Sequence, residues 1–408
     1  MRILLLTDHF YPDLSSGGRL LTDLSGVLAE KGEWVHVLTT YSRYNTTETG
    51  PPREHYKGFF IERVPSSEFS RSNILGRSLN ELSFCFSALW RALFTVRPDV
   101  ICVISSPPFL PVFVYVLSFF RKIPYVYIMM DVFPDLAVKL GMLSPDSLMV
   151  RIWNFISHRA LGGASRIVVL GRCMKQVIEG KLNESAVPVE VIHNWADRER
   201  LFPLSRPGNP FFDKHPYLRD KFIVQYSGNL GRFQDFETIL SAAEELANDP
   251  QISFLIIGEG YRRHWIEGEI AKRNLSNTIL LPFQDQEDLL YSLNAADVAL
   301  VTLERGAEGL GVPSKFYPIL AVGKPVIAIM SPSSEVALTT LEHDLGYVVE
   351  QENVQALVSL IKHIASNSEE CDLKGQRARD AFIRHFDRSI STERYREVLY
   401  SSLKGNVR

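Results

Sequence analysis

The chain has 408 residues and a mass of 46.3 kDa, a length typical of two domains rather than of one small core. Hydrophobic residues make up 46% and charged residues 22%, which excludes a disordered, collagen-like or coiled-coil protein. The net charge is −3, from 44 Lys and Arg against 47 Asp and Glu, which excludes a general nucleic-acid binder. Residues 1–190 hold 20 basic and 17 acidic side chains. This mildly basic first half suits an anionic contact, with chance as the alternative.

The predicted elements begin with a strand at 2–7, a loop at 8–18, a helix that ends at Gly32 and a strand at 35–40. This order is the opening of a doubly wound α/β sheet. Further strands of the same half are predicted at 60–64, 99–105, 125–130 and 166–171, with helices at Leu79–Thr95, Phe109–Phe120 and Leu148–Ala160.

The pattern restarts in the second half. Residues 205–220 contain three prolines and a glycine and are typical of a linker or surface loop. After them strands and helices alternate again, from the strand near 221–226 to the strand at 346–349, which predicts a second parallel sheet. We therefore expect an α/β fold with two Rossmann-like domains facing a central cleft, over residues 1–195 and 196–385. A C-terminal helix at 386–408 would pack on either half.

No transmembrane segment or metal motif is evident. The longest apolar stretch, 107–120, is too short to span a bilayer as a helix. The four cysteines form no CxxC pair, which indicates neither a zinc site nor a redox motif and favours a reduced, cytoplasmic compartment.

The loops that follow strands are the places to look for ligand-binding residues. Gly17 and Gly18 follow the first strand and would let the backbone approach an anion at the start of a helix, or would only form a turn. Gly228, Asn229 and Arg232 follow a second-half strand, in a loop that would cradle a diphosphate or again be only a tight turn. Further along, Gly258 and Glu259 belong to a Gly-Glu-Gly sequence, which is weaker evidence.

The sequence Gly309–Tyr317 is the most informative. It places Pro313 at the expected first position of a helix and Ser314 and Lys315 in its first turn. Lysine is unfavourable there against the helix dipole, and a bound anion would compensate for it.

Asp131 follows the strongly apolar strand at 125–130 and is the first polar residue at its carboxyl end. A carboxylate in that position would orient a substrate hydroxyl or act as a base, or would only cap a turn. Asp8 and His9 end the first strand and are weaker candidates of the same kind.

These motifs together resemble one family. The chain is similar to the retaining GT-B glycosyltransferases of family four, especially the bacterial branch that builds O-antigen, capsule and exopolysaccharide. The resemblance covers nearly the whole chain and is carried by six segments: MRILLLTDHFYPDLSSGG, MDVFPD, HNWAD, YSGNLGRFQDFETIL, IIGEG and, most specifically, VPSKFYPILAVGKPVIA.

The resemblance implies roles for several residues. Gly17 and Gly18 match the loop that approaches the donor phosphate, and Arg232 matches the basic position of the second domain. Ser314 and Lys315 match the helix start that meets the donor diphosphate. Asp131 lies where many relatives place a histidine.

The sequence also departs from the wider family. Leu310 and Pro318 fall near the positions of the two-glutamate signature, Gln234 replaces a frequent lysine, and Trp195 replaces the glycine of the usual Asn-Gly. In the family, the first glutamate of that signature usually contacts the sugar hydroxyls, and this sequence has no glutamate at that position.

We therefore predict a glycosyltransferase that moves a sugar from a nucleoside diphosphate sugar, by resemblance a UDP-sugar, with retention of the anomeric configuration. The implied acceptor is a saccharide linked to polyprenyl diphosphate, with peripheral contact at the inner membrane face. The segment 79–97 has the composition of an interfacial helix, with a core helix as the alternative. No metal is expected, because no DxD motif is present.

The alternatives are a nucleotide-sugar epimerase of the same two-domain shape and a non-catalytic nucleotide-binding module. Interconversion of a UDP-sugar supplied alone would favour the epimerase, and turnover of any donor would exclude the binding module.

Overall fold

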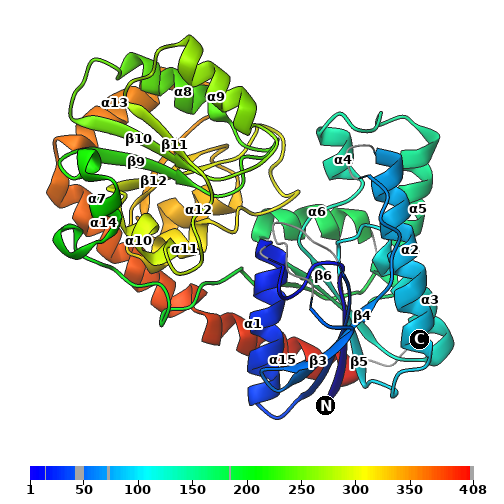
Figure 1. The fold of residues 1–408 in the computed structure, drawn as a ribbon. Helices are drawn as coiled ribbons and strands as arrows, with labels where there is room; N and C mark the ends of the chain where they lie inside the picture. The colour runs from blue at the N-terminus through cyan, green and yellow to red at the C-terminus, as the bar shows by residue number, and fades with distance from the viewer. Residues whose placement is uncertain (14, 42–49, 71–73, 183–184, 405–408) are drawn as a thin grey trace. The chain divides into compact units, whose positions relative to one another are not determined.

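A computed structural model describes the chain except residues 14, 42–49, 71–73, 183–184 and 405–408. The chain forms two compact units, each built on one sheet. The first unit comprises Met1–His193, Gly309–Gly311 and Ser389–Arg408, and the second comprises Asn194–Glu308 and Val312–Arg388. Both units have the α/β architecture with parallel sheets that the alternating pattern predicts (Figure 1).

The first unit contains an eight-stranded sheet in the order β3-β4-β2-β1-β5-β6-β7-β8. All neighbouring strands are parallel except β3 and β4, which form an antiparallel edge pair that the sequence did not predict. The strands are β1 (Arg2–Leu6), β2 (Trp34–Thr40), β3 (Arg53–Tyr56), β4 (Phe59–Val64), β5 (Val100–Ile104), β6 (Tyr125–Met129), β7 (Arg166–Val169) and β8 (Val189–Val191).

Helices lie on both sides of this sheet, with α2, α3 and α5 together on one side and α1 and α15 on the other (Figure 1). The strands between them are apolar on both faces, and β5 and β6 are buried at every position. The helices of this unit are α1 (Ser16–Glu30), α2 (Ile74–Leu93), α3 (Leu110–Arg121), α4 (Asp135–Lys139), α5 (Leu148–Gly162), α6 (Arg172–Leu182) and α15 (Arg388–Lys404).

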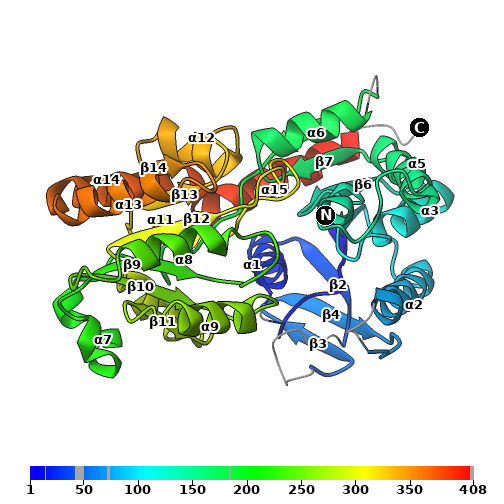
Figure 2. The same ribbon diagram turned by 90° about the horizontal axis from the view of Figure 1, so that it is seen from above.

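The second unit contains a six-stranded, fully parallel sheet in the order β11-β10-β9-β12-β13-β14, which Figure 2 shows from above. The strands are β9 (Phe222–Ser227), β10 (Ile252–Ile257), β11 (Thr278–Leu281), β12 (Val298–Thr302), β13 (Val326–Ile329) and β14 (Gly346–Val349). The helices of this unit are α7 (Phe211–Lys214), α8 (Phe236–Glu245), α9 (Arg263–Lys272), α10 (Leu289–Asn294), α11 (Phe316–Ala321), α12 (Glu335–Glu342), α13 (Val354–Ala365) and α14 (Ser368–Ala381).

Buried apolar side chains cover both faces of the second sheet. Helices α8 and α13 pack on one face, and α11, α12 and α14 pack on the other. The interpretation of residues 205–220 as a linker or surface loop was wrong in part, because Phe211, Phe212 and Leu218 are buried against β9 and β10. Hydrophobic burial outweighs the turn-forming prolines that led to that prediction.

The last helix packs within the first unit. It follows a short π-helical turn at Phe382–Phe386. The Tyr400 hydroxyl donates to a Glu33 carboxylate oxygen at 2.7 Å, and Arg396 Nε lies 3.2 Å from the same oxygen. Helices α4, α6, α7, α12 and α13 were not predicted. No helix in the described part of the chain is long and apolar enough to cross a membrane.

Candidate functional site

The candidate donor site of the second unit is built around Lys315. Its Nζ lies 3.6 Å from the centroid of the Tyr226 ring and donates a hydrogen bond to the Tyr226 hydroxyl. That hydroxyl in turn donates to the Asn229 carbonyl at 2.7 Å. Burial lowers the pKa of the Lys315 ammonium well below its usual value, because the charged form loses water without gaining a carboxylate partner within the described chain.

Lys315 lies at the helix start, but not within the first turn as the sequence predicted. Helix α11 begins at Phe316 and Lys315 is its N-cap residue. The reason is a turn in which the Phe316 N–H donates to the Pro313 carbonyl, so Pro313 precedes the helix instead of occupying its first position. Ser314 lies in the same turn and is partly buried.

Glycines bring the loops after β9 and β10 together. A Cβ on Gly228 would lie 2.9 Å from Lys315 Cε, and a Cβ on Gly258 would lie 1.9 Å from the Gly228 carbonyl oxygen. Gly260, at φ +150°, approaches Leu230 in the same way. The glycines therefore allow these loops and the lysine to approach one another.

Arg232 and Glu259 lie on the exposed side of these loops. The Arg232 guanidinium stacks on the Tyr261 ring, with 3.7 Å between its Cζ and the ring centroid. Arg232 is exposed and has no ion pair within the described chain, so its charge is available to an anion. Glu259 pairs with Arg263 at 3.1 Å, and its carbonyl accepts from the Leu230 N–H. The structure thus brings Gly228, Asn229, Gly258, Glu259 and Lys315 together.

In the first unit, Gly17 and Gly18 form the first turn of α1. Ser15 is the N-cap residue, and its hydroxyl accepts from the Gly18 N–H at 3.1 Å. A Cβ on Gly18 would lie 2.9 Å from that hydroxyl oxygen, whereas a Cβ on Gly17 would meet nothing within 4 Å. Gly18 is therefore required by its own loop, and only Gly17 has open space for a ligand.

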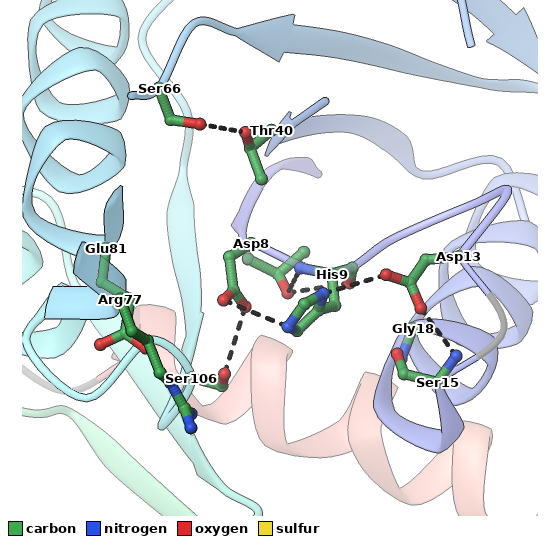
Figure 3. A network of polar contacts seen from close by, with 11 residues as sticks. Asp8, His9, Asp13, Ser15, Gly18, Thr40, Ser66, Arg77, Glu81 and Ser106 are labelled. Carbon is green, nitrogen blue, oxygen red and sulfur yellow. Dashed lines mark hydrogen bonds and ion pairs between the residues drawn. The ribbon is translucent and has the colours of Figure 1, made fainter. Parts of the chain in front are cut away.

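A polar network occupies the end of β1 beside this glycine loop (Figure 3). His9 lies between two carboxylates, with Nδ1 3.0 Å from Asp13 Oδ2 and Nε2 3.4 Å from Asp8 Oδ2. Asp13 also accepts from the Ser15 N–H at 2.7 Å, so the histidine is tied to the N-cap of α1. On the other side, the Ser106 hydroxyl donates to Asp8 Oδ1 at 3.2 Å. The loop contains Leu14, which lies outside the described residues.

Asp131 stands at the carboxyl end of β6, as the sequence predicted. Its N–H donates to the Ser105 hydroxyl at 3.0 Å. The residue forms a backbone bridge with Gly311, whose added Cβ would lie 3.0 Å from Asp131 Oδ1. Burial raises the pKa of the Asp131 carboxyl to about 6. A carboxyl with a pKa near neutrality is suited to accept or hold a proton.

Sequence reasoning missed four residues of these sites. Asp13, Ser105, Ser106 and Tyr226 each contact a predicted candidate. Asp13 follows a proline in an irregular loop, and Tyr226 reads as one more apolar position of β9. Only their spatial neighbours identify them, although the position of Ser106 just after β5 was an available signal.

Comparison with known proteins places the chain among the glycosyltransferases. Residues 17–195 match the glycosyl transferase 4-like domain, and residues 209–381 match the glycosyl transferases group 1. The chain is 32% identical over 340 residues to the probable glycosyltransferase WbjE of Pseudomonas aeruginosa, covering 80% of this chain and 82% of that protein. The chain therefore belongs to the glycosyltransferase family that these two domains define, and it is a glycosyltransferase.

A second relative is also named as a glycosyl transferase, and two solved structures share the fold of this chain. The putative colanic acid biosynthesis glycosyl transferase WcaI of Escherichia coli is 25% identical, over 89% of this chain and 91% of that protein. Sucrose-phosphate synthase from Thermosynechococcus elongatus superposes with a TM-score of 0.78 at 16% identity, and covers 99% of both chains. Anabaena HepE in complex with UDP-glucose superposes with a TM-score of 0.71 at 16% identity over 98% of this chain and 100% of that one. These structural matches confirm the GT-B type of fold.

Proposed function

We propose that the protein transfers a sugar from a UDP-sugar to a saccharide acceptor in the synthesis of a cell-surface polysaccharide. The observation that carries the donor assignment is the partly buried Lys315 ammonium, which has no carboxylate partner within the described chain. A diphosphate would supply the missing negative charge. HepE, which has the same fold, binds UDP-glucose in its crystal structure, and WcaI is named for colanic acid synthesis, which supports this substrate class.

Lys315 and Arg232 would stabilise the departing diphosphate. Negative charge grows on that group as the glycosidic bond breaks, and fixed cations stabilise it most where water is displaced. Arg232 presents a planar guanidinium held on Tyr261, which suits bidentate contact with phosphate oxygens. With both cations in place, we propose that transfer needs no metal ion. Retention of the anomeric configuration is proposed from the family resemblance.

The first unit would hold the acceptor. Asp131 follows β6 and the Asp8–His9–Asp13 network follows β1, the two strands on either side of β5. They offer carboxylates and an imidazole at the carboxyl ends of these strands, where hydroxyl groups of a saccharide would be oriented. We propose that this saccharide is linked to polyprenyl diphosphate and that the enzyme works peripherally at the inner membrane face. The exposed apolar side chains of the first unit support that placement.

A donor screen tests this function. Thermal shift with UDP- and GDP-sugars should show stabilisation by UDP-sugars, of about 2.7 kcal/mol at 100 times Kd. Stabilisation by GDP-sugars alone would overturn the choice of base. Interconversion of the sugar without an acceptor would indicate an epimerase instead.

Transfer should persist in excess EDTA, and a loss of activity that Mg²⁺ or Mn²⁺ restores would contradict the metal-free proposal. NMR of the product linkage reports the anomeric configuration.

A further inference from the structure

Three neighbouring helices of the first unit carry large apolar side chains that face solvent. Helix α3 packs between α2 and α5, on one side of the sheet (Figure 1). Aromatic contacts join them: the rings of Phe86 and Phe113 lie 4.9 Å apart between α2 and α3, and those of Phe109 and Trp153 lie 4.8 Å apart between the start of α3 and α5. The three helices therefore form one layer.

Large apolar side chains on this layer face solvent at helical spacing. Trp90 is 68% exposed, Phe120 75% and Leu148 72%, which is unusual for side chains of this size. We call the whole set the apolar face. Its members are Leu75, Leu79, Phe86, Trp90, Leu93 and Phe94 from α2 and the residue that follows it, Val116, Phe119 and Phe120 from α3, and Leu148, Met149, Ile152 and Phe155 from α5.

The charge of this layer is opposite in sign to that of the chain. Residues 74–97, 109–122 and 148–162 contain seven Lys and Arg and one acidic residue, Glu81, whereas the whole chain carries −3. Arg77 pairs with Glu81 and Arg91 pairs with Glu62. The other five cations have no carboxylate partner within the described chain: Arg97, Arg121, Lys122, Arg151 and Arg159.

We propose that the apolar face docks on a bilayer containing anionic phospholipid, with its aromatic side chains entering the interface and its cations contacting lipid phosphates. Apolar burial combined with attraction to anionic lipid is the basis of interfacial binding without a spanning helix. A protein partner would gain nothing from a cationic rim unless it were acidic, whereas anionic lipid satisfies both features at once. The inference deepens the proposed function, because it assigns the surface that brings the enzyme to a lipid-linked acceptor.

Vesicle co-sedimentation of the full chain, without donor or acceptor, tests this proposal. The protein should bind vesicles of phosphatidylglycerol and phosphatidylcholine, bind pure phosphatidylcholine far more weakly, and lose affinity as salt rises. Combining Trp90→Ser with Phe120→Ser should lower the partition coefficient at least about tenfold. Combining Lys122→Gln with Arg151→Gln should lower it by about fivefold for each charge, and only on the anionic vesicles.

Leu341→Ser is the matched control, because Leu341 is an exposed leucine of α12 in the second unit. It should bind vesicles as the unaltered protein does. Equal binding to both kinds of vesicle, or undiminished binding by the Trp90 and Phe120 variant, would overturn the proposal. A dimer in sedimentation velocity that this variant abolishes, without vesicle binding, would assign the face to a second copy instead. UDP binding, measured separately, tests the proposed function, so the two failures are distinguishable.

Discussion

The Lys315 ammonium lies 3.6 Å from the centre of the Tyr226 ring and donates a hydrogen bond to the hydroxyl of the same tyrosine. Tyr226 is fully buried and comes from the central part of the second sheet, whereas Lys315 is the N-cap residue of α11. The ring and hydroxyl hold the charge, but they do not neutralise it. A ligand with negative charge would therefore gain from a cation that is already ordered.

Replacing Lys315 with Met should weaken UDP binding by about one to two decades, since one charge-assisted contact contributes roughly 1.5–3 kcal/mol. The melting temperature should not fall, because the substitution removes a poorly solvated charge. Titration calorimetry and thermal unfolding measure the two quantities. Lys221→Met, at a partly exposed lysine of the same unit, should leave UDP affinity unchanged. Unaltered affinity in the Lys315 variant would remove this residue from the donor site.

UDP binding should take up a proton at alkaline pH. Burial lowers the pKa of Lys315 in the free protein, and a bound diphosphate would raise it again by favouring the charged form. Affinity should therefore fall as pH rises from the lowered pKa toward the ordinary lysine value of about 10.4. Calorimetry in buffers of different ionisation enthalpy reports the proton uptake. The same uptake in Lys315→Met would assign the proton to another group.

Gly17→Ala and Gly18→Ala should behave differently. A Cβ at 17 meets nothing, so alanine should stabilise α1 by about 0.5–1 kcal/mol. A Cβ at 18 lies 2.9 Å from Ser15 Oγ and should disturb the N-cap, at a cost of roughly 0.5–2 kcal/mol. Chemical denaturation measures both. A slower transfer by the more stable Gly17 variant would support ligand approach at this residue, and a normal rate would contradict it.

Asp131→Asn should be more stable than the unaltered protein above pH 6. Burial raises the folded-state pKa of Asp131 to about 6, so the folded protein holds a proton that the unfolded chain releases near pH ~4. Above the folded-state pKa, burial of the ionised carboxylate lowers the free energy of unfolding by its full amount. This destabilisation disappears as the pH falls toward the unfolded-state pKa. The difference in free energy of unfolding between the Asn variant and the unaltered protein should therefore shrink as the pH falls from the folded-state pKa to the unfolded-state pKa. A constant difference across this range would assign the carboxyl an ordinary pKa.

The same Asp131→Asn variant tests the catalytic role. If the carboxylate orients the acceptor hydroxyl or accepts its proton, single-turnover transfer should fall about 10²–10⁴-fold, with UDP affinity unchanged. The rate of the unaltered enzyme should also decline as pH falls through about 6, where Asp131 becomes protonated. A near-normal rate in the Asn variant would leave Asp131 as a structural partner of Ser105 and Gly311.

The sequence by itself determined the architecture and the neighbourhood of the site. Alternating apolar strands and amphipathic helices define two α/β units, because strands buried on both faces must be apolar throughout. Position after a strand was enough to select Asp131, since the carboxyl ends of parallel strands meet at one edge. The unusual lysine near a helix start was likewise visible as a local conflict with the helix dipole.

Only the tertiary structure decided what these residues contact. The pairing of Lys315 with Tyr226 joins residues 89 positions apart, and the approach of Gly258 to Gly228 depends on the register of β9 and β10. Helix α11 begins at Phe316 and not at Pro313, where the local sequence predicted its start. Phe211 is buried, although the prolines around it predicted a surface loop. Local patterns record backbone preference and burial, whereas the partner of a polar side chain is set by long-range packing, which a single sequence does not display.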